Sequence, residues 1–330
     1  MKGAGVAKSA STTLDNPKSS SAITLRTPKQ IAWARFRGNK VGIISGAVAS
    51  FFLLLAIFAP LIVKLWGLEE GKLYGENLDD TGMPIGKFGG MSLAHPLGIE
   101  PGAGRDIFTL LLYGSRISFT VAAITSVTSI GLGLVIGISS GYFKGKFDAI
   151  VGRFSDFILA FPATFMIVAL SIPMVQRVES MGIAKENGAR IVVLIAFFVF
   201  FGWAGFARLV RSQALSMRER DFVLASQALG ASNWRIISKE ILPNLWPTAI
   251  VFLSLSLPGF LSAEAVFSFL GVGIQAPAST WGLVLADSIT YWRADPAYLL
   301  IPCIMLIVIV LSLNLLGDAI RDAIDPKSER

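Results

Sequence analysis

The segment VGIISGAVASFFLLLAIFAPLIV, residues 41–63, carries no charged side chain. At 1.5 Å of rise per residue, a helix of about 20 apolar residues matches the ~30 Å hydrocarbon core of a lipid bilayer. A core helix of a soluble protein seldom needs so long an unbroken apolar run. The segment therefore predicts a transmembrane helix.

Five further apolar blocks follow along the chain. Together with residues 41–63 they predict six spans, the other five covering residues 118–141, 149–172, 191–210, 248–270 and 298–316. The third block is unusual for a span because it contains Arg153, Asp156 and Pro162. The whole chain is 53% hydrophobic and 15% charged, against roughly 45–50% and about 25% in ordinary soluble domains. These features predict an all-α membrane protein with six transmembrane helices.

Lysine and arginine side chains cluster beside the apolar blocks on one side of the predicted bundle. The clusters lie at residues 26–40, at 144–146, within 211–239 and at 321–330. The positive-inside rule therefore predicts that both termini are cytoplasmic, in a bacterial-type plasma (inner) membrane. The net charge of +7 does not indicate nucleic-acid binding, because such proteins gather their basic residues on one folded face.

Composition divides the chain into four parts. Residues 1–30 are rich in Ser, Thr and Lys without an apolar stretch, which predicts a disordered cytoplasmic tail rather than a cleavable signal peptide. Residues 31–116 are expected to hold the first span and a long external loop, and residues 117–317 the transmembrane core. Residues 318–330 are expected to form a second cytoplasmic tail.

A polar stretch between the fourth and fifth spans, residues 211–247, is predicted to be cytoplasmic and to form two short amphipathic helices broken at Gly230. Phe222, Ala225 and Leu229 share one face of the first helix, and Trp234, Ile237 and Ile241 share one face of the second. Gly230 suits a left-handed helix cap, and Pro243 and Pro247 are predicted to stop the second helix before the fifth span. The apolar faces need a cover, for which the bundle, the lipid headgroups and a soluble partner all remain open.

This loop resembles the EAA motif of ABC-importer permeases, which reads Glu-Ala-Ala, three residues, Gly, nine residues and Ile-x-Leu-Pro. Ala225, Gly230, Leu242 and Pro243 stand at matching positions, whereas Leu224, Ser226 and Glu240 depart from the motif. In that family the loop forms the coupling helix that enters a cleft of an ATPase subunit. The resemblance thus implies an ATPase-coupling site made of Ala225, Ser226, Ala228, Leu229, Gly230, Ala231, Ser232, Leu242 and Pro243.

Four other segments extend the resemblance. Residues 35–62, 95–119, 263–282 and 314–326 look like parts of the C-type permease subunit of dipeptide and oligopeptide importers. The resemblance implies a type I ABC-importer permease fold, with one N-terminal peripheral helix and a five-helix core. It also implies a second homologous permease, two ATPase subunits that bind ATP and Mg, and an extracytoplasmic solute-binding protein.

The function implied is that of half of the translocation pathway of an ATP-driven peptide importer. Two alternatives stay open: an importer of nickel complexes or glutathione, and a secondary transporter that works without ATPases. The chain has no Gly-x4-Gly-Lys-[Ser/Thr] sequence, so ATP hydrolysis is expected only in partner subunits. No catalytic, cofactor-binding or metal-binding residues are expected, and the lone histidine, His95, is interpreted as structural.

Three charged features complete the prediction. Glu264 lies inside the fifth span, where an ionisable residue indicates a pathway or gate residue, a hydrogen bond between packed helices, or exposure at the interface. Arg208, Arg153 and Asp156 are interpreted as boundary anchors and ion pairs rather than an inner gate. Asp106 is expected to pair with its neighbour Arg105 in the external loop.

A last feature concerns helix packing. Gly133, Gly137 and Gly141 recur at four-residue spacing in the second span and form a flat stripe. Such a stripe lets another helix approach closely, which predicts bundle packing rather than gating.

Overall fold

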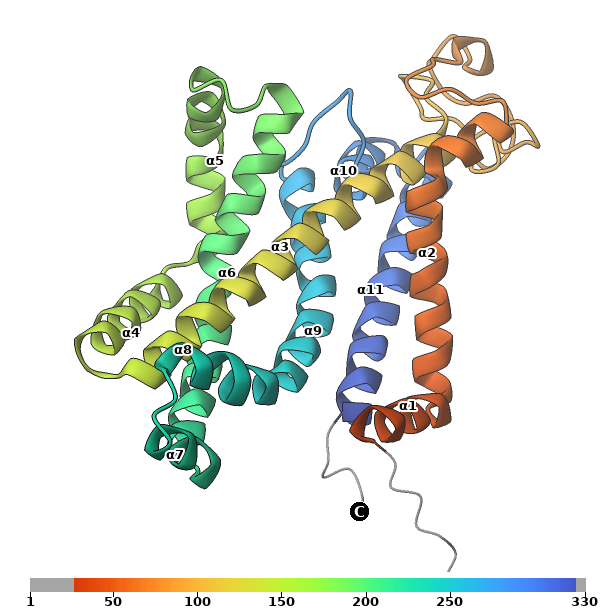
Figure 1. Cartoon of the computed structure of the whole chain (residues 1–330). Coiled ribbons are helices and arrows are strands. Elements are labelled where there is room, and N and C mark those ends of the chain that lie inside the picture. The colour runs from red at the N-terminus through yellow and green to blue at the C-terminus, as the bar shows by residue number, and fades with distance from the viewer. Residues whose placement is uncertain (1–26, 325–330) are drawn as a thin grey trace, which may run out of the picture.

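The computed structural model describes residues 27–324, and this part of the chain is helical with no regular strand (Figure 1). The α-helices are α1 (Pro28–Gly38), α2 (Lys40–Leu65), α3 (Ile107–Phe143), α4 (Gly145–Ala160), α5 (Ala163–Ser180), α6 (Glu186–Arg218), α7 (Asp221–Ala228), α8 (Asn233–Ile236), α9 (Leu242–Phe269), α10 (Trp281–Tyr291) and α11 (Pro296–Ile324). A short 3₁₀ turn, Gly75–Asn77, lies in the loop between α2 and α3, and a π-helical turn, Ile237–Ile241, joins α8 to α9. The predicted all-α class is confirmed. Residues 1–26 and 325–330 of the two predicted tails lie outside the described residues.

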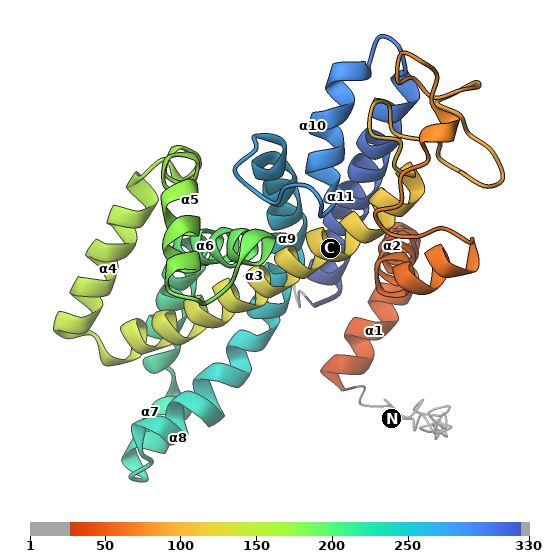
Figure 2. The same cartoon turned by 90° about the horizontal axis from the view of Figure 1, so that it is seen from above.

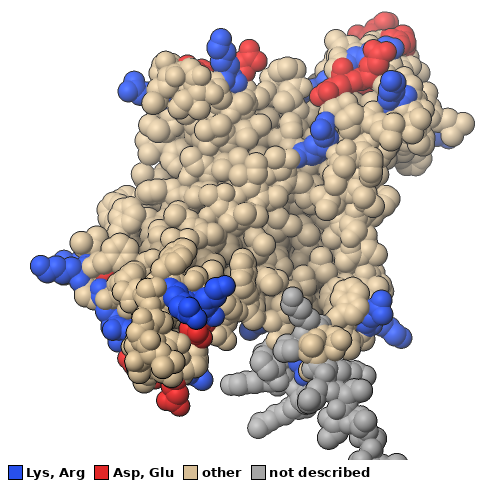
Figure 3. All heavy atoms as spheres, in the orientation of Figure 1, with Lys and Arg blue, Asp and Glu red and all other residues tan. Residues whose placement is uncertain are grey.

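Within residues 27–324, five helical segments are long and apolar enough to cross a membrane, and a sixth span results if α4 and α5 are counted as one. The five are α2, α3, α6, the α8–α9 segment and α11. Figure 3 shows charged side chains gathered towards the two ends of the molecule, with a largely uncharged band between them. This distribution fits a multi-pass membrane protein.

The predicted third span, residues 149–172, is not one continuous helix. The chain bends by 87° between α4 and α5. Phe161 is extended (ψ 135°) and Pro162 precedes the first turn of α5. The proline ring disfavours helical geometry in the residue before it, so α4 ends at Ala160. The predicted third span is therefore a bent pair of helices, which counts as one span only when α4 and α5 are taken together.

The longest helix contact runs along α3, which crosses α6 (Figures 1 and 2). Gly133, Gly137 and Gly141 face α6 at this crossing. A Cβ atom on Gly137 would lie 2.6 Å from the carbonyl oxygen of Ala207, and one on Gly141 would lie 2.6 Å from that of Arg211. The absence of these side chains lets the two backbones touch, and the predicted packing role of the glycine stripe is confirmed.

The long loop between α2 and α3 is tied together by buried polar contacts. Arg105 Nε donates to Glu100 Oε2 at 2.5 Å, and Tyr298 of α11 donates its hydroxyl to Glu100 Oε1 at 2.9 Å. The hydrogen bond and charge of Glu100 raise the pKa of the Arg105 guanidinium. These contacts hold the loop against the end of α11.

The predicted ion pair between Arg105 and Asp106 was wrong. Asp106 is the N-cap of α3, where its Oδ1 accepts a hydrogen bond from the Thr109 backbone N–H at 2.7 Å. Its other oxygen, Oδ2, lies 2.9 Å from Nδ1 of His95. Adjacent extended residues point their side chains in opposite directions, so Arg105 turns to Glu100. His95 is buried in this network, in agreement with a structural role.

The predicted stop at Pro243 and Pro247 was also wrong. The chain stays helical from Asn233 through the π turn and into α9, which contains Pro247. In the π turn the Leu242 N–H bonds to the carbonyl of Ile237, one residue further back than in an α-helix. Pro243 lies in the first turn of α9, where the N–H that it lacks is not needed.

Candidate functional site

The loop after α6 turns sharply at Gly230. This residue has φ +78°, its N–H bonds to the carbonyl of Gln227 at 2.9 Å, and the N–H of Ala231 bonds to Ser226 at 3.0 Å. The two bonds form a Schellman cap that ends α7. Both the predicted break and the left-handed conformation at Gly230 are confirmed.

One face of the loop is packed against the bundle. Val223 of α7, Ile236 of α8, and Ile241 and Leu245 beyond it are buried in a cluster with residues of α3 and α6, including Val210. The burial of Val223 and Ile236 was not predicted. Each lies one position along its helix from a residue that was assigned to the apolar face, Phe222 and Ile237 respectively. Their burial anchors the loop to the ends of α3 and α6.

Outside this buried cluster the loop exposes large apolar side chains. We call it the loop patch, which consists of Phe222, Leu224, Leu229 and Trp234. Leu229 is 88% exposed and Trp234 is 77% exposed. The bundle therefore leaves the predicted face of Phe222 and Leu229 uncovered.

Polar contacts connect the loop to the end of α3. The Tyr142 hydroxyl donates to Asn233 Oδ1 at 2.9 Å, and the guanidinium of Arg218 lies 5.8 Å from the centre of the Tyr142 ring. Lys144 Nζ lies 3.1 Å from a carboxylate oxygen of Glu219. The loop is thus in contact with α3 as well as with α6.

The predicted coupling residues occupy both sides of the turn. Ala225, Ala228, Leu229, Gly230, Ser232 and Pro243 are exposed, and Ser226, Ala231 and Leu242 are half-buried. Ser226 and Glu240 both depart from the EAA motif, and they contact each other. The Ser226 hydroxyl lies 3.4 Å from Glu240 Oε1. This pair links α7 to the π turn across the Gly230 break.

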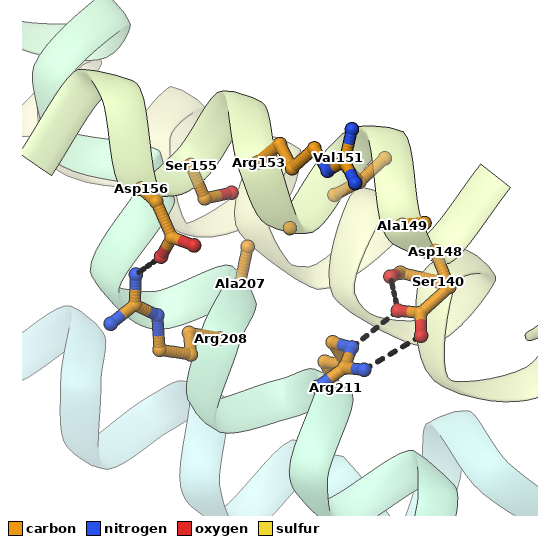
Figure 4. A pocket seen from close by; sticks show the side chains of 11 residues that line it. Ser140, Asp148, Ala149, Val151, Arg153, Ser155, Asp156, Ala207, Arg208 and Arg211 are labelled. Atoms are coloured by element: carbon orange, nitrogen blue, oxygen red, sulfur yellow. Dashed lines mark hydrogen bonds and ion pairs between the residues drawn. The ribbon is translucent and has the colours of Figure 1, made fainter. Parts of the chain in front are cut away.

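A groove between α4 and α6 adjoins the loop and has a volume of 340 Å³ (Figure 4). At one end Arg211 binds both carboxylate oxygens of Asp148, with Nη2 2.6 Å from Oδ2, and Ser140 donates to the same carboxylate. At the other end Arg208 pairs with Asp156. The predicted ion pairing at this boundary is confirmed for these two residues, whereas the Asp148–Arg211 pair was not foreseen.

Glu264 is fully buried inside the bundle. Its Oε2 accepts a hydrogen bond from Ser118 of α3 at 2.5 Å, and its Oε1 accepts one from Ser268 at 2.7 Å. This geometry agrees with the hydrogen bond between packed helices and not with exposure at the interface. A role of Glu264 in the pathway stays a prediction.

No group of three or more His, Cys, Asp or Glu side chains within residues 27–324 could hold a metal ion. The polar groups instead pair with one another at the ends and crossings of helices.

Comparison with known proteins gives consistent matches. Residues 133–330 match the family described as "Binding-protein-dependent transport system inner membrane component", and residues 27–65 match that described as "N-terminal TM domain of oligopeptide transport permease C". The dipeptide transport system permease protein DppC of Alkalihalophilus pseudofirmus is 33% identical, over 95% of this chain and 94% of the relative. The glutathione transport system permease protein GsiD of Pectobacterium atrosepticum is 31% identical, over 92% of this chain and 93% of the relative. A solved structure of the MetNI methionine ABC transporter in an inward-facing conformation aligns with a TM-score of 0.49 and 19% identity, over 66% of this chain and 96% of that chain.

Proposed function

The chain belongs to the family of binding-protein-dependent transport system inner membrane components, and from this premise we propose that it is the permease subunit of an ATP-driven peptide importer. It forms half of the translocation pathway, and a second, homologous permease forms the other half. An extracytoplasmic solute-binding protein delivers the peptide. The family description names binding-protein-dependent transport, so a secondary transporter is no longer favoured.

The single observation that carries the coupling role is the loop patch. Four large apolar side chains are exposed on a loop that other residues anchor to α3 and α6. An apolar surface on a fixed support suits a protein partner, because burial of each such side chain stabilises a complex by about 1.5–3 kcal/mol. We assign this partner as an ATPase subunit, one of two that bind ATP and Mg and drive transport.

Peptides are the proposed substrate class. One relative carries a dipeptide transport name, and the match to the N-terminal domain of oligopeptide permease C covers residues 27–65. The glutathione transport name of another relative supports a narrower alternative, since glutathione is itself a short peptide. Nothing in the chain favours nickel complexes over either.

The proposed orientation places both termini and the loop patch in the cytoplasm. The basic residues Arg35, Arg37 and Lys40 flank the start of α2, and Arg218, Arg220 and Arg235 lie on or beside the loop. The loop between α2 and α3 then faces outwards, where the binding protein docks. This arrangement follows the positive-inside rule.

The experiment is a matched pair of leucine substitutions in the affinity-tagged full-length chain, purified from membranes that contain its partner subunits. Leu229→Glu places a charge in the loop patch, and Leu93→Glu places one on the external loop, where Leu93 is 96% exposed. The ATPase subunits should co-purify with the Leu93→Glu chain and be lost from the Leu229→Glu chain. Equal recovery of ATPase subunits with both variants would remove the coupling assignment.

A further inference from the structure

Helix α4 lies across the bundle instead of along it. Its 16 residues span about 24 Å at 1.5 Å per residue, which is less than the ~30 Å hydrocarbon core. It makes an angle of 87° with α5, and Figure 2 shows it at the outer edge of the bundle. Taken alone, a helix this short does not cross the bilayer, and its ion pairs with Arg208 and Arg211 hold it beside the end of α6 from which the loop patch projects.

One side of α4 is an exposed aromatic stripe. Phe147, Ile150, Phe154 and Phe157 follow one another at three- and four-residue spacing, and all four are exposed. Exposed Phe161 and Phe165 continue this apolar surface onto α5. The stripe thus continues onto α5, and an exposed aromatic surface of this kind suits the acyl region of a bilayer.

The stripe is bordered by basic residues. Lys146 and Arg153 are seven residues apart on α4, so they lie on one line along the helix, between the stripe and the carboxylates of Asp148 and Asp156. Both carboxylates are already paired, with Arg211 and Arg208. Within the described residues Arg153 has no carboxylate at ion-pair distance, and Figure 4 shows its guanidinium at the groove without a drawn contact.

We propose that the groove between α4 and α6 binds the phosphodiester headgroup of an anionic phospholipid, with Arg153 contacting the phosphate and Lys146 beside it. The acyl chains of this lipid lie along the stripe of Phe154 and Phe157. The groove is open and 340 Å³ in volume, which accommodates a headgroup. Three arginines and two carboxylates line the groove, which gives it a net charge of one positive unit. This charge complements the single negative charge of a phosphodiester.

This site is independent of peptide transport, because it requires only the folded chain in a bilayer. The test uses the purified full-length chain with its partner subunits, exchanged into phosphatidylcholine with or without phosphatidylglycerol. Retained phosphatidylglycerol is counted by native mass spectrometry. Arg153→Gln should lower retention about fivefold, as expected for the loss of one basic residue near a membrane surface at ~1 kcal/mol. Arg153→Lys should keep most of it.

Arg321→Gln is the matched control, since Arg321 is exposed near the end of α11 on the same side and outside the groove. This variant should retain phosphatidylglycerol like the unmodified chain. The proposal would be overturned by equal retention in the Arg153→Gln chain, or by an equal loss in the control, which would indicate general surface charge. It would also be overturned if inorganic phosphate displaced the lipid at the concentration at which phosphatidylglycerol binds, because the groove would then be a site for a soluble anion.

Discussion

Ser118 Oγ donates a 2.5 Å hydrogen bond to Oε2 of Glu264, which connects α3 to α9 inside the bundle. The two residues stand 146 positions apart in the chain. An acidic residue at the centre of a span costs about 2.5–3.5 kcal/mol on insertion scales, so it persists only with partners or a function. Glu264 has partners on both oxygens, and its first role is to hold two spans together.

Glu264→Ala should therefore destabilise the folded chain by about 1–3 kcal/mol, because it leaves two buried hydroxyls without their acceptor. Glu264→Gln should destabilise it less, since the amide keeps one acceptor oxygen. The measurement is the unfolding temperature of the purified complex in detergent. Ser262→Ala is the control on the same helix, because the Ser262 hydroxyl bonds only to the backbone of Pro258.

The same variants separate packing from gating. If Glu264→Gln melts like the unmodified chain but changes the dependence of uptake on peptide concentration, Glu264 also contributes to the pathway. If both variants lower the unfolding temperature and uptake falls only with the amount of folded complex, packing is its whole role. No change in stability on Glu264→Ala would contradict the packing interpretation.

The contact between α3 and α6 gives a sharper test of stability. Gly137→Ala places a methyl group 2.6 Å from the Ala207 carbonyl oxygen and 2.7 Å from Val210 Cβ, whereas Gly131 on the same helix has no atom within 4 Å of an added Cβ. Overpacking of this kind costs about 1–3 kcal/mol. Gly137→Ala should lower the unfolding temperature and the yield of folded chain, and Gly131→Ala should leave both unchanged or slightly raised. Equal effects at the two positions would refute the close approach of the helices.

The orientation can be measured by cysteine labelling in a Cys303→Ser background. A membrane-impermeant thiol reagent added to whole cells should label Leu93→Cys and leave Arg220→Cys unlabelled, since both positions are exposed and the proposal places them on opposite sides. Permeabilised cells should be labelled at both. Labelling of position 220 alone in intact cells would reverse the topology.

The spans could be predicted because the prediction depends on the summed hydrophobicity of about 20 residues. A single polar residue within such a segment does not change the result. The break at Gly230 was also predictable, since a glycine between two amphipathic segments marks a helix cap. The 87° bend after α4 carried a visible signal in Pro162, but an apolar block read as a whole averages over such a residue. The spacing of Phe147, Ile150, Phe154 and Phe157 could have identified α4 as a surface helix.

Other features were beyond the reach of local reasoning. At the π turn Ile237–Ile241 the hydrogen bonding shifts by one residue, and the chain remains helical through Pro243. No residue type in the sequence indicates this shift. The partners of Glu264 and of Arg105 lie in distant or differently oriented segments, and proximity in sequence misdirected the pairing of Arg105 with Asp106. Such contacts depend on the packing of whole helices.

Gly230→Val should uncouple ATP hydrolysis from transport. Gly230 has φ +78°, a conformation strongly disfavoured for β-branched residues, and it is exposed beside Leu229 in the loop patch. An added Cβ meets no atom within 4 Å, so the bundle itself is not disturbed. Gly182→Val is the matched control, because Gly182 has φ +70° and equally open surroundings in the loop between α5 and α6, at the other end of α6.

Both variants should insert in the membrane, and only Gly230→Val should lose either its ATPase subunits or the stimulation of ATP hydrolysis by the loaded binding protein. Loss of uptake in both variants would point to backbone strain alone, and normal uptake with Gly230→Val would exclude this turn from the coupling contact.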